Sequence, residues 1–163
     1  EFSNFARMPR PILKKVDVIQ LINKSLDFIK LTSKNSINLF NGTSKHFING
    51  DEDQLNRVFI NLIKNSEESF LEKLQKDPNF KGNIDIEIDD NNDYIIIRIT
   101  DNDTGITDTK KAMTPYFTTK KTGTGLGLPI VTKIINEHSG NFSIKNQTGK
   151  SGSLLKITLP QYA

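Results

Sequence analysis

The feature that most constrains the fold is a long amphipathic segment, residues 52–75 of the 163-residue chain. At ~100° per residue its apolar side chains occupy an arc of roughly 160°, which predicts a helix with one buried face. These side chains are Leu55, Val58, Phe59, Leu62, Ile63, Phe70 and Leu74. Asn61 and Asn65 lie one turn apart, just beyond one edge of that arc. A helix edge can pack against the protein and also line a pocket, so both amides are candidate ligand-binding groups.

Shorter patterns predict the remaining elements. Two further helices are expected at 17–30, where Asp17 can cap the first turn, and at 126–138. Strands are expected at 36–41, 84–88, 94–100, 141–146 and 153–160. The strand "YIIIRIT" is apolar on nearly both faces and is therefore expected near the centre of the sheet. This order predicts an α+β fold, a two-layer α/β sandwich with a mixed, mostly antiparallel sheet. Residues 101–125 lack a regular pattern and are expected to form a long lid or binding loop.

Composition narrows the class of protein without naming a function. The net charge is +3, but acidic and basic residues alternate, so there is no basic stripe of the kind that follows a nucleic acid. The absence of cysteine excludes disulfide frameworks and thiolate metal sites. No apolar run approaches the ~20 residues of a membrane span. The chain begins at Glu1 without methionine, and we expect it to be a fragment with residues 1–16 as a helix end and linker stiffened by Pro9 and Pro11.

Two polar segments carry candidate ligand-binding residues. In "TDNDTGI", residues 100–106, Asp101 stands at a strand end, where it can accept a hydrogen bond from a ligand's amino group. Gly105 permits a close backbone approach, although a plain polar turn is the alternative. In "TGTGLGLPIV", residues 122–131, Gly123, Gly125 and Gly127 run directly into a helix. Backbone N–H groups at such a helix start can bind an anion, with a flexible hinge as the alternative.

The residues between these segments add further candidates. Lys120 and Lys121 lie beside the glycines and can meet phosphate as point charges, although solvated surface lysines are the alternative. Phe117 is an aromatic side chain in an otherwise polar loop. The amide oxygen of Asn65 is a hard neutral ligand suited to Mg²⁺, whose other ligands are usually phosphate and water. A purely structural amide is the alternative for Asn65.

Together, in this order, the segments resemble the nucleotide-binding fold shared by sensor histidine kinases, type II topoisomerases, heat-shock chaperone ATPases and MutL mismatch-repair proteins. The resemblance covers about residues 17–160. "DQLNRVFINLIKNSEES" resembles the N box, "DNDTGI" the G1 box, "PYFTT" the F box and "GTGLGL" the G2 box. "EHSGNFSI" and "ITLP" resemble the histidine-kinase version. "EFSNFARMPRP" resembles the junction after the dimerisation helices in NtrY-type nitrogen-regulation kinases of bacteria. The resemblance therefore implies a catalytic domain at 17–163, preceded by the end of a dimerisation helix and a linker.

The resemblance also implies roles for matching positions. Asn65 would bind Mg²⁺, Asp101 would hold the adenine amino group of ATP, and Phe117 would anchor a lid at about 107–122. Glycines 123, 125 and 127 would wrap the phosphates. The implied ATP-binding set is Asn61, Asn65, Asp101, Gly105, Ile106, Phe117, Thr119, Lys120, Gly123, Thr124, Gly125, Leu126, Gly127, Leu128 and Thr158.

Three features depart from the family pattern. Asp103 replaces the middle glycine of D-x-G-x-G, which places a side chain where bare backbone is usual. Glu68 stands three residues after Asn65, where many histidine kinases carry a basic residue. His46 and His138 both lack the acidic residue and proline that follow a phospho-accepting histidine, so we expect structural or exposed roles for them.

Asn61 separates kinases from ATPases within the resembled family. Hydrolysing relatives carry a glutamate at that place as the general base for water, and an amide has no such basicity. We therefore expect a histidine kinase domain that passes the γ-phosphate to a histidine on a separate dimerisation domain, then to a response regulator. The domain is expected in the cytoplasm, within a homodimer at the inner membrane. A chaperone-like ATPase clamp and a regulatory module with weak nucleotide binding remain the alternatives.

Overall fold

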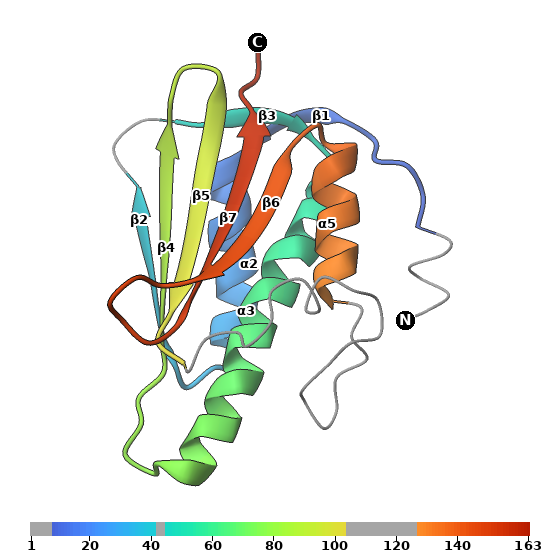
Figure 1. The fold of residues 1–163 in the computed structure, drawn as a ribbon. Helices are drawn as coiled ribbons and strands as arrows, with labels where there is room; N and C mark the ends of the chain where they lie inside the picture. Colours follow the sequence, from blue (N-terminus) through green and yellow to red (C-terminus); the bar gives the residue numbers. More distant parts are fainter. Residues whose placement is uncertain (1–7, 42–44, 104–126) are drawn as a thin grey trace.

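The computed structural model describes residues 8–41, 45–103 and 127–163, and its architecture has two layers (Figure 1). One layer is a five-stranded sheet in the order β2-β4-β5-β7-β6, and the helices cover one of its faces. A second, two-stranded sheet pairs β1 with β3. In chain order the elements are β1 (Lys14–Asp17), α2 (Val18–Lys30), β2 (Ser36–Asn41), β3 (Phe47–Gly50), α3 (Glu52–Lys76), β4 (Asn83–Asp90), β5 (Tyr94–Asp101), α5 (Gly127–Glu137), β6 (Asn141–Asn146) and β7 (Ser153–Pro160).

Helices α2 and α3 begin at capping aspartates. The Asp17 side chain accepts hydrogen bonds from two backbone N–H groups in the first turn of α2, as predicted. Asp51 accepts from the N–H of Gln54 at the start of α3, which satisfies an otherwise unpaired donor. The predicted apolar face of α3 is buried from Leu55 to Phe70, and the C-terminal half of the helix extends past the sheet.

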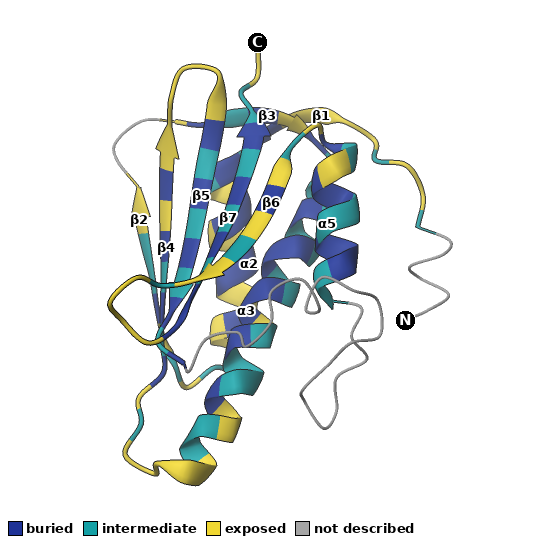
Figure 2. Ribbon diagram, viewed as in Figure 1, coloured by how far each residue is buried: buried dark blue, intermediate teal, exposed yellow. Residues whose placement is uncertain are grey.

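The sheet is mixed because β2 pairs with β4 in parallel while the other neighbours are antiparallel. Strand β5 lies between β4 and β7, the central place predicted for it. Its inward isoleucines, Ile95, Ile97 and Ile99, are at most 1% exposed. Figure 2 shows this alternation of buried and more exposed positions along β4, β5 and β7. The predicted α+β sandwich is therefore the observed fold.

Strands β1 and β3 do not follow from the sequence pattern. The sequence predicts that residues 1–16 are a helix end and linker. Residues 14–16 instead pair antiparallel with β3, and both Val16 and Ile48 are buried. Each strand has only four residues, too few for a clear alternation, and their pairing depends on a contact distant in sequence. In the described part of the chain, no helix combines the length and apolar character needed to cross a bilayer.

Candidate functional site

The site is centred on Asp101, the last residue of β5, whose side chain is only 5% exposed. Its Oδ2 atom accepts hydrogen bonds from the hydroxyl of Ser66 at 2.7 Å and from that of Ser153 at 2.9 Å. Its Oδ1 atom accepts from the backbone N–H of Ser153 at 3.0 Å and, more weakly, from that of Asp103 at 3.4 Å. The carboxyl group is thus fixed by donors from α3, β7 and the chain that follows β5.

These four donors explain how a carboxyl group can lie buried at this place. A buried charge is costly unless it is hydrogen-bonded, and here both oxygens have partners. A carboxylate can accept about four hydrogen bonds, and a serine hydroxyl can rotate its hydrogen to suit a new neighbour. Asp101 is therefore a fixed acceptor that can still receive a donor from a ligand if the two hydroxyls turn.

The turn between β6 and β7 closes around the end of β5. Gln147 donates from Nε2 to the backbone oxygen of Asp101 at 2.6 Å. Gly152 has a φ of 120°, and a Cβ atom there would lie 1.8 Å from the same oxygen. Only glycine fits this contact, because a side chain would occupy the space of the Asp101 carbonyl.

Asn65 brings α3 and α5 into this region. It precedes Ser66, which bonds to Asp101, and its amide lies beside the start of α5: a Cβ atom on Gly127 would be 3.4 Å from Asn65 Nδ2 and 3.7 Å from Oδ1. Asn61 lies one turn closer to the start of α3, and both asparagines are half-buried, at the predicted edge of the apolar face.

The first turn of α5 contributes the other described candidates. Gly127 is the first residue of the helix, and the half-buried Leu128 packs against the core. Pro129 is buried in the first turn, where backbone N–H groups have no partner within the helix, so its missing N–H breaks no helical hydrogen bond. The N–H groups at a helix start favour an anion through their orientation and the helix dipole. Because a Cβ atom on Gly127 would lie in van der Waals contact with Asn65, the neighbour of Ser66, this helix start lies in the same region as Asp101.

Most of the remaining predicted residues lie outside the described part of the chain: Gly105, Ile106, Phe117, Thr119, Lys120, Gly123, Thr124, Gly125 and Leu126. Thr158 is described, but the structure does not bring it to Asp101. It pairs with Ile96 and Asn141, five residues along β7 from Ser153, and it alternates with the inward residues of that strand. Its side chain is therefore on the open face of the sheet.

Sequence reasoning missed the two serines that hold Asp101. Ser66 lies within a predicted helix, and Ser153 is the first residue of a predicted strand, so neither breaks a local pattern. Asn102 was also missed. Its side chain accepts from Asn83 N at 2.8 Å and donates to Lys81 O at 2.9 Å, which anchors the chain leaving β5 to the start of β4. A polar residue directly beside a predicted ligand-binding residue was the available signal.

Two of the departures from the family motifs, Asp103 and Glu68, lie near these residues. Asp103 is 6% exposed, so its carboxyl group is buried two residues beyond Asp101. Glu68 is half-buried on α3, one turn past Asn65. Asp103 thus brings a second acidic side chain close to the centre of the site.

The two histidines lie away from this region and are buried. His138 accepts a hydrogen bond at Nε2 from the N–H of Asp51 at 3.0 Å, and its Nδ1 lies 2.7 Å from Ile134 O. Nδ1 of His46 lies 3.3 Å from Asp90 Oδ2. These contacts agree with the structural roles expected from the sequence.

A cavity of about 420 Å³ lies at the opposite end of the sheet from Asp101. It is lined by Leu13, Ile48, Asn49, His138, Ser139 and residues 159–163. None of the predicted site residues lines it, so its position does not change the assignment of the site to the Asp101 region.

Comparison with known families gives an independent result. The family model described as histidine kinase-, DNA gyrase B- and HSP90-like ATPase matches residues 50–163. A putative NtrY-like sensor histidine kinase of Rickettsia conorii is 34% identical over 160 residues, covering 96% of this chain and 26% of the relative. Sporulation kinase C of Bacillus subtilis is 36% identical over 151 residues, covering 91% of this chain and 32% of the relative. The chain therefore spans about a quarter to a third of the length of these relatives.

Solved structures agree on the fold. A mycobacterial sensor histidine kinase, MprB, matches with a TM-score of 0.76 at 20% identity, covering 92% of this chain and 98% of that chain. Full-length ShkA, crystallised in complex with AMPPNP, matches with a TM-score of 0.79 at 17% identity, covering 98% of this chain and 34% of that chain. The predicted fold and the resemblance to the sensor histidine kinase version of it are confirmed.

Proposed function

The chain belongs to the family of histidine kinase-, DNA gyrase B- and HSP90-like ATPases, as an ATP-binding domain of the sensor histidine kinase type, and we propose that its Asp101 region binds the nucleotide. The observation that carries this proposal is the fixed, buried carboxyl group of Asp101, bonded to Ser66, with the preceding residue Asn65 close to Gly127 at the start of α5. The arrangement offers an acceptor for a base, an amide for a metal and a helix start for phosphate.

Asp101 is the proposed receptor for the adenine amino group. A carboxylate only accepts hydrogen bonds, so it suits the exocyclic N–H₂ of adenine and not the carbonyl oxygen that guanine carries at the same ring position. Ser66 and Ser153 hold the carboxyl group in one orientation, and their hydroxyls can turn to make room for the amino group. A base that carries a carbonyl oxygen at this position would place an acceptor against the carboxylate, and the two acceptors cannot hydrogen-bond, so the site disfavours it.

Magnesium fits this region as an ion shared between protein and phosphate. Asn65 offers one amide oxygen, and within residues 8–41, 45–103 and 127–163 there is no group of three His, Cys, Asp or Glu side chains that could hold a metal ion. Mg²⁺ commonly takes few protein ligands and completes its shell with phosphate oxygens and water, which agrees with this sparse donor set. When bound, the ion would neutralise phosphate charge, and Asn65 would hold it through the amide oxygen.

The phosphates are proposed to lie at the start of α5. The unpaired N–H groups of a helix start favour an anion, and Gly127 places no side chain between this helix start and the Asn65 amide. The predicted roles of Lys120, Gly123 and Gly125 at the phosphates remain part of the proposal. Asn61 offers no base for water, so the bound ATP would be kept for a nucleophile supplied from elsewhere. The domain's contribution to phosphoryl transfer would be positioning and charge stabilisation.

For the whole protein, we propose transfer of the γ-phosphate to a histidine on a separate dimerisation domain, and from there to a response regulator. The NtrY-like relatives support a role in nitrogen-related signalling. The domain would lie in the cytoplasm, within a homodimer anchored at the inner membrane. This chain alone is expected not to phosphorylate itself.

Calorimetry with a non-hydrolysable ATP analogue tests the nucleotide site. We expect Mg²⁺-dependent binding that Asn65→Ala abolishes, because the variant loses the amide oxygen that is proposed to hold the metal. Asn136→Ala is the matched control, since Asn136 is exposed near the other end of α5. Absence of binding to the unaltered chain at millimolar analogue would contradict the proposal and favour a regulatory module that has lost nucleotide, for which the buried Asp103 is the supporting observation.

Labelled ATP separates a kinase domain from an ATPase clamp. We expect no appreciable hydrolysis by the chain alone, because Asn61 is not a base for water. We also expect no incorporation of label, because neither His46 nor His138 is followed by the residues of a phospho-accepting histidine. Asn61→Glu is expected to introduce measurable hydrolysis. Steady hydrolysis by the unaltered chain would favour the clamp, and label on the chain itself would contradict the expected separation of the phospho-accepting histidine.

A further inference from the structure

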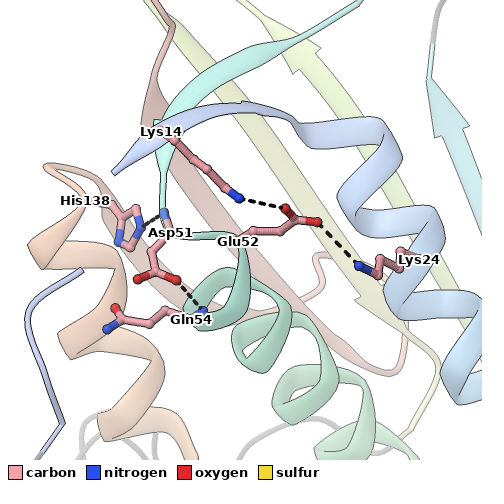
Figure 3. Close-up of polar contacts among 6 residues, drawn as sticks. All are labelled: Lys14, Lys24, Asp51, Glu52, Gln54 and His138. Carbon is pink, nitrogen blue, oxygen red and sulfur yellow. Dashed lines mark hydrogen bonds and ion pairs between the residues drawn. The ribbon is translucent and has the colours of Figure 1, made fainter. Parts of the chain in front are cut away.

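A second polar cluster joins three segments at the end of the molecule opposite Asp101 (Figure 3). Oδ1 of Asp51 accepts from the N–H of Gln54 at 3.1 Å, and Oδ2 accepts from the N–H of Ile12 at 2.9 Å. The N–H of Asp51 itself donates to Nε2 of His138 at 3.0 Å. Gln54 also donates from Nε2 to Pro9 O at 2.9 Å. We call Ile12, Asp51, Gln54 and His138 the Asp51 junction.

His138 ties the end of α5 to this junction in one protonation pattern. Ile134 O can only accept a hydrogen bond, so Nδ1 of His138 must carry a hydrogen toward it. The N–H of Asp51 can only donate, so Nε2 must be bare. Both ring nitrogens of this buried side chain are therefore used by a neutral imidazole, and the ring joins the end of α5 to the start of α3.

The segment before β1 meets the same carboxyl group from the other side. Burial alone would raise the pKa of Asp51, but the N–H groups of Ile12, Gln54 and Asp53 lower it below its usual value. The Asp51 junction thus favours the ionised form of the Asp51 carboxyl group. Glu52 forms ion pairs of 3.6 Å with Lys14 and Lys24 beside it (Figure 3), but exposed pairs of this kind contribute little. The hydrogen bonds to Asp51 are the firmer link.

Helices α3 and α5 connect the Asp51 junction to the candidate nucleotide site. From Asp51, α3 runs 14 residues to Asn65, roughly 21 Å at 1.5 Å per residue. Helix α5 begins at Gly127, against Asn65, and ends next to His138, so the two packed helices meet at both places (Figure 1). Protein interiors are packed too closely to absorb a shift locally, so sliding one helix along the other at the junction changes the contact between Asn65 and Gly127.

We propose that Asp51 and His138 are positioning residues for the nucleotide site, and that residues 8–13, docked on Asp51 and Gln54, set the register of α3 against α5. The expected effect on nucleotide binding rests on the proposed function. The expected effect on the register of α3 against α5 does not. The chain preceding α2 would thereby be coupled to the nucleotide site, because a change in the docking of residues 8–13 alters the spacing of Asn65 and Gly127.

Substitution of Ile12 can remove the single hydrogen bond from its N–H group to Asp51. Its side chain is 81% exposed, so Ile12→Ala removes little packing and keeps the backbone N–H. Ile12→Pro removes the side chain and also the N–H that reaches Asp51. From the other side, Asp51→Ser keeps a helix cap and the N–H to His138 but has no second oxygen for Ile12. The double variant Ile12→Pro/Asp51→Ser closes a mutant cycle.

The measurement is the amide chemical shift of Ser66 and Gly127 in the nucleotide-free chain, followed by calorimetry with the ATP analogue. We expect Ile12→Pro and Asp51→Ser to move both distant amides and to weaken nucleotide binding about threefold to tenfold, with no further change in the double variant. Ile12→Ala should leave both readouts unchanged. Shifts confined to residues near 12 and 51 in both single variants would overturn the inference. If the unaltered chain binds no nucleotide, the proposed function fails, and the amide shifts still decide the role of the junction.

Discussion

Asp101 and Asp51 are both aspartates that join three segments of the chain, but their hydrogen-bond donors differ in kind. Among the described residues, Asp51 receives backbone N–H groups, whose directions are fixed by the local fold. Asp101 receives two serine hydroxyls in addition to backbone N–H groups. Hydroxyl hydrogens can rotate away and backbone hydrogens cannot. Asp51 is therefore suited to hold elements together, whereas Asp101 can exchange internal donors for those of a ligand.

The largest expected effect concerns how tightly the chain closes around Asp101. Gly152→Ala should destabilise the fold by about 3 kcal/mol, because the new Cβ atom meets the Asp101 carbonyl at 1.8 Å. Gly149→Ala, in the same turn, is the matched control: its φ of 72° carries a cost, but nothing lies within 4 Å, so about 1 kcal/mol is expected. Urea denaturation measures both. Equal losses would mean that the close contact at Asp101 is not what requires glycine.

Replacing the exchangeable carboxylate tests whether Asp101 receives the base. Asp101→Asn should weaken binding of the ATP analogue by about tenfold to a hundredfold, since a charged acceptor for the amino group is lost. The fold should persist, because the amide oxygen can accept from the backbone N–H of Ser153 while the amide NH2 donates to the serine hydroxyls, which can also accept. Asp89→Asn, on an exposed part of β4, is the control and should bind normally. Unchanged affinity in Asp101→Asn, measured by calorimetry, would place the base elsewhere.

A smaller effect is expected at Asp103. Asp103→Asn keeps the size of this buried side chain but removes its charge, so the anionic nucleotide should bind about threefold more tightly. Asp103→Gly restores the residue usual in the family and should move affinity in the same direction. If calorimetry finds no change in either variant, the site accommodates Asp103 without cost to binding.

The smallest effect is at Asp51 and depends on pH. Its folded-state pKa lies below the unfolded value, so its charged form stabilises the fold above about pH 4, and this contribution disappears as pH falls through the lowered pKa. Asp51→Asn should therefore cost roughly a few tenths of a kcal/mol at pH 7, and the cost should shrink as the pH falls below about 4. Urea denaturation across this pH range checks the prediction. A cost that grows toward acid pH would reverse the assigned sign.

The sequence predicted the long elements well because their signals are local. The apolar face of α3 and the isoleucines of β5 repeat over enough residues to be recognised, and Asp17 caps α2 as its position indicates. Strands β1 and β3 escaped prediction because four residues carry almost no period, and each is stabilised by pairing with a distant segment.

The candidate site was predictable only in part. Asp101, Asn65 and Gly127 could be named from their motifs, and the structure brings their elements together. Ser66 and Ser153 could not, because a single hydroxyl has no period and its partner is set by how α3 and β7 meet β5. Thr158 shows the reverse case, since only the register of β7 reveals that it faces away from Asp101.

Backbone amide shifts can be followed while the chain is titrated with a non-hydrolysable ATP analogue and Mg²⁺. We predict that the largest changes occur at Ser66, Ser153 and Gly127, around Asp101. The amides of Gln161 and Tyr162, which line the cavity at the other end of the sheet, should change far less. Largest changes at Gln161 and Tyr162, with Ser66 and Ser153 unmoved, would contradict the assignment of Asp101 as the receptor for the base.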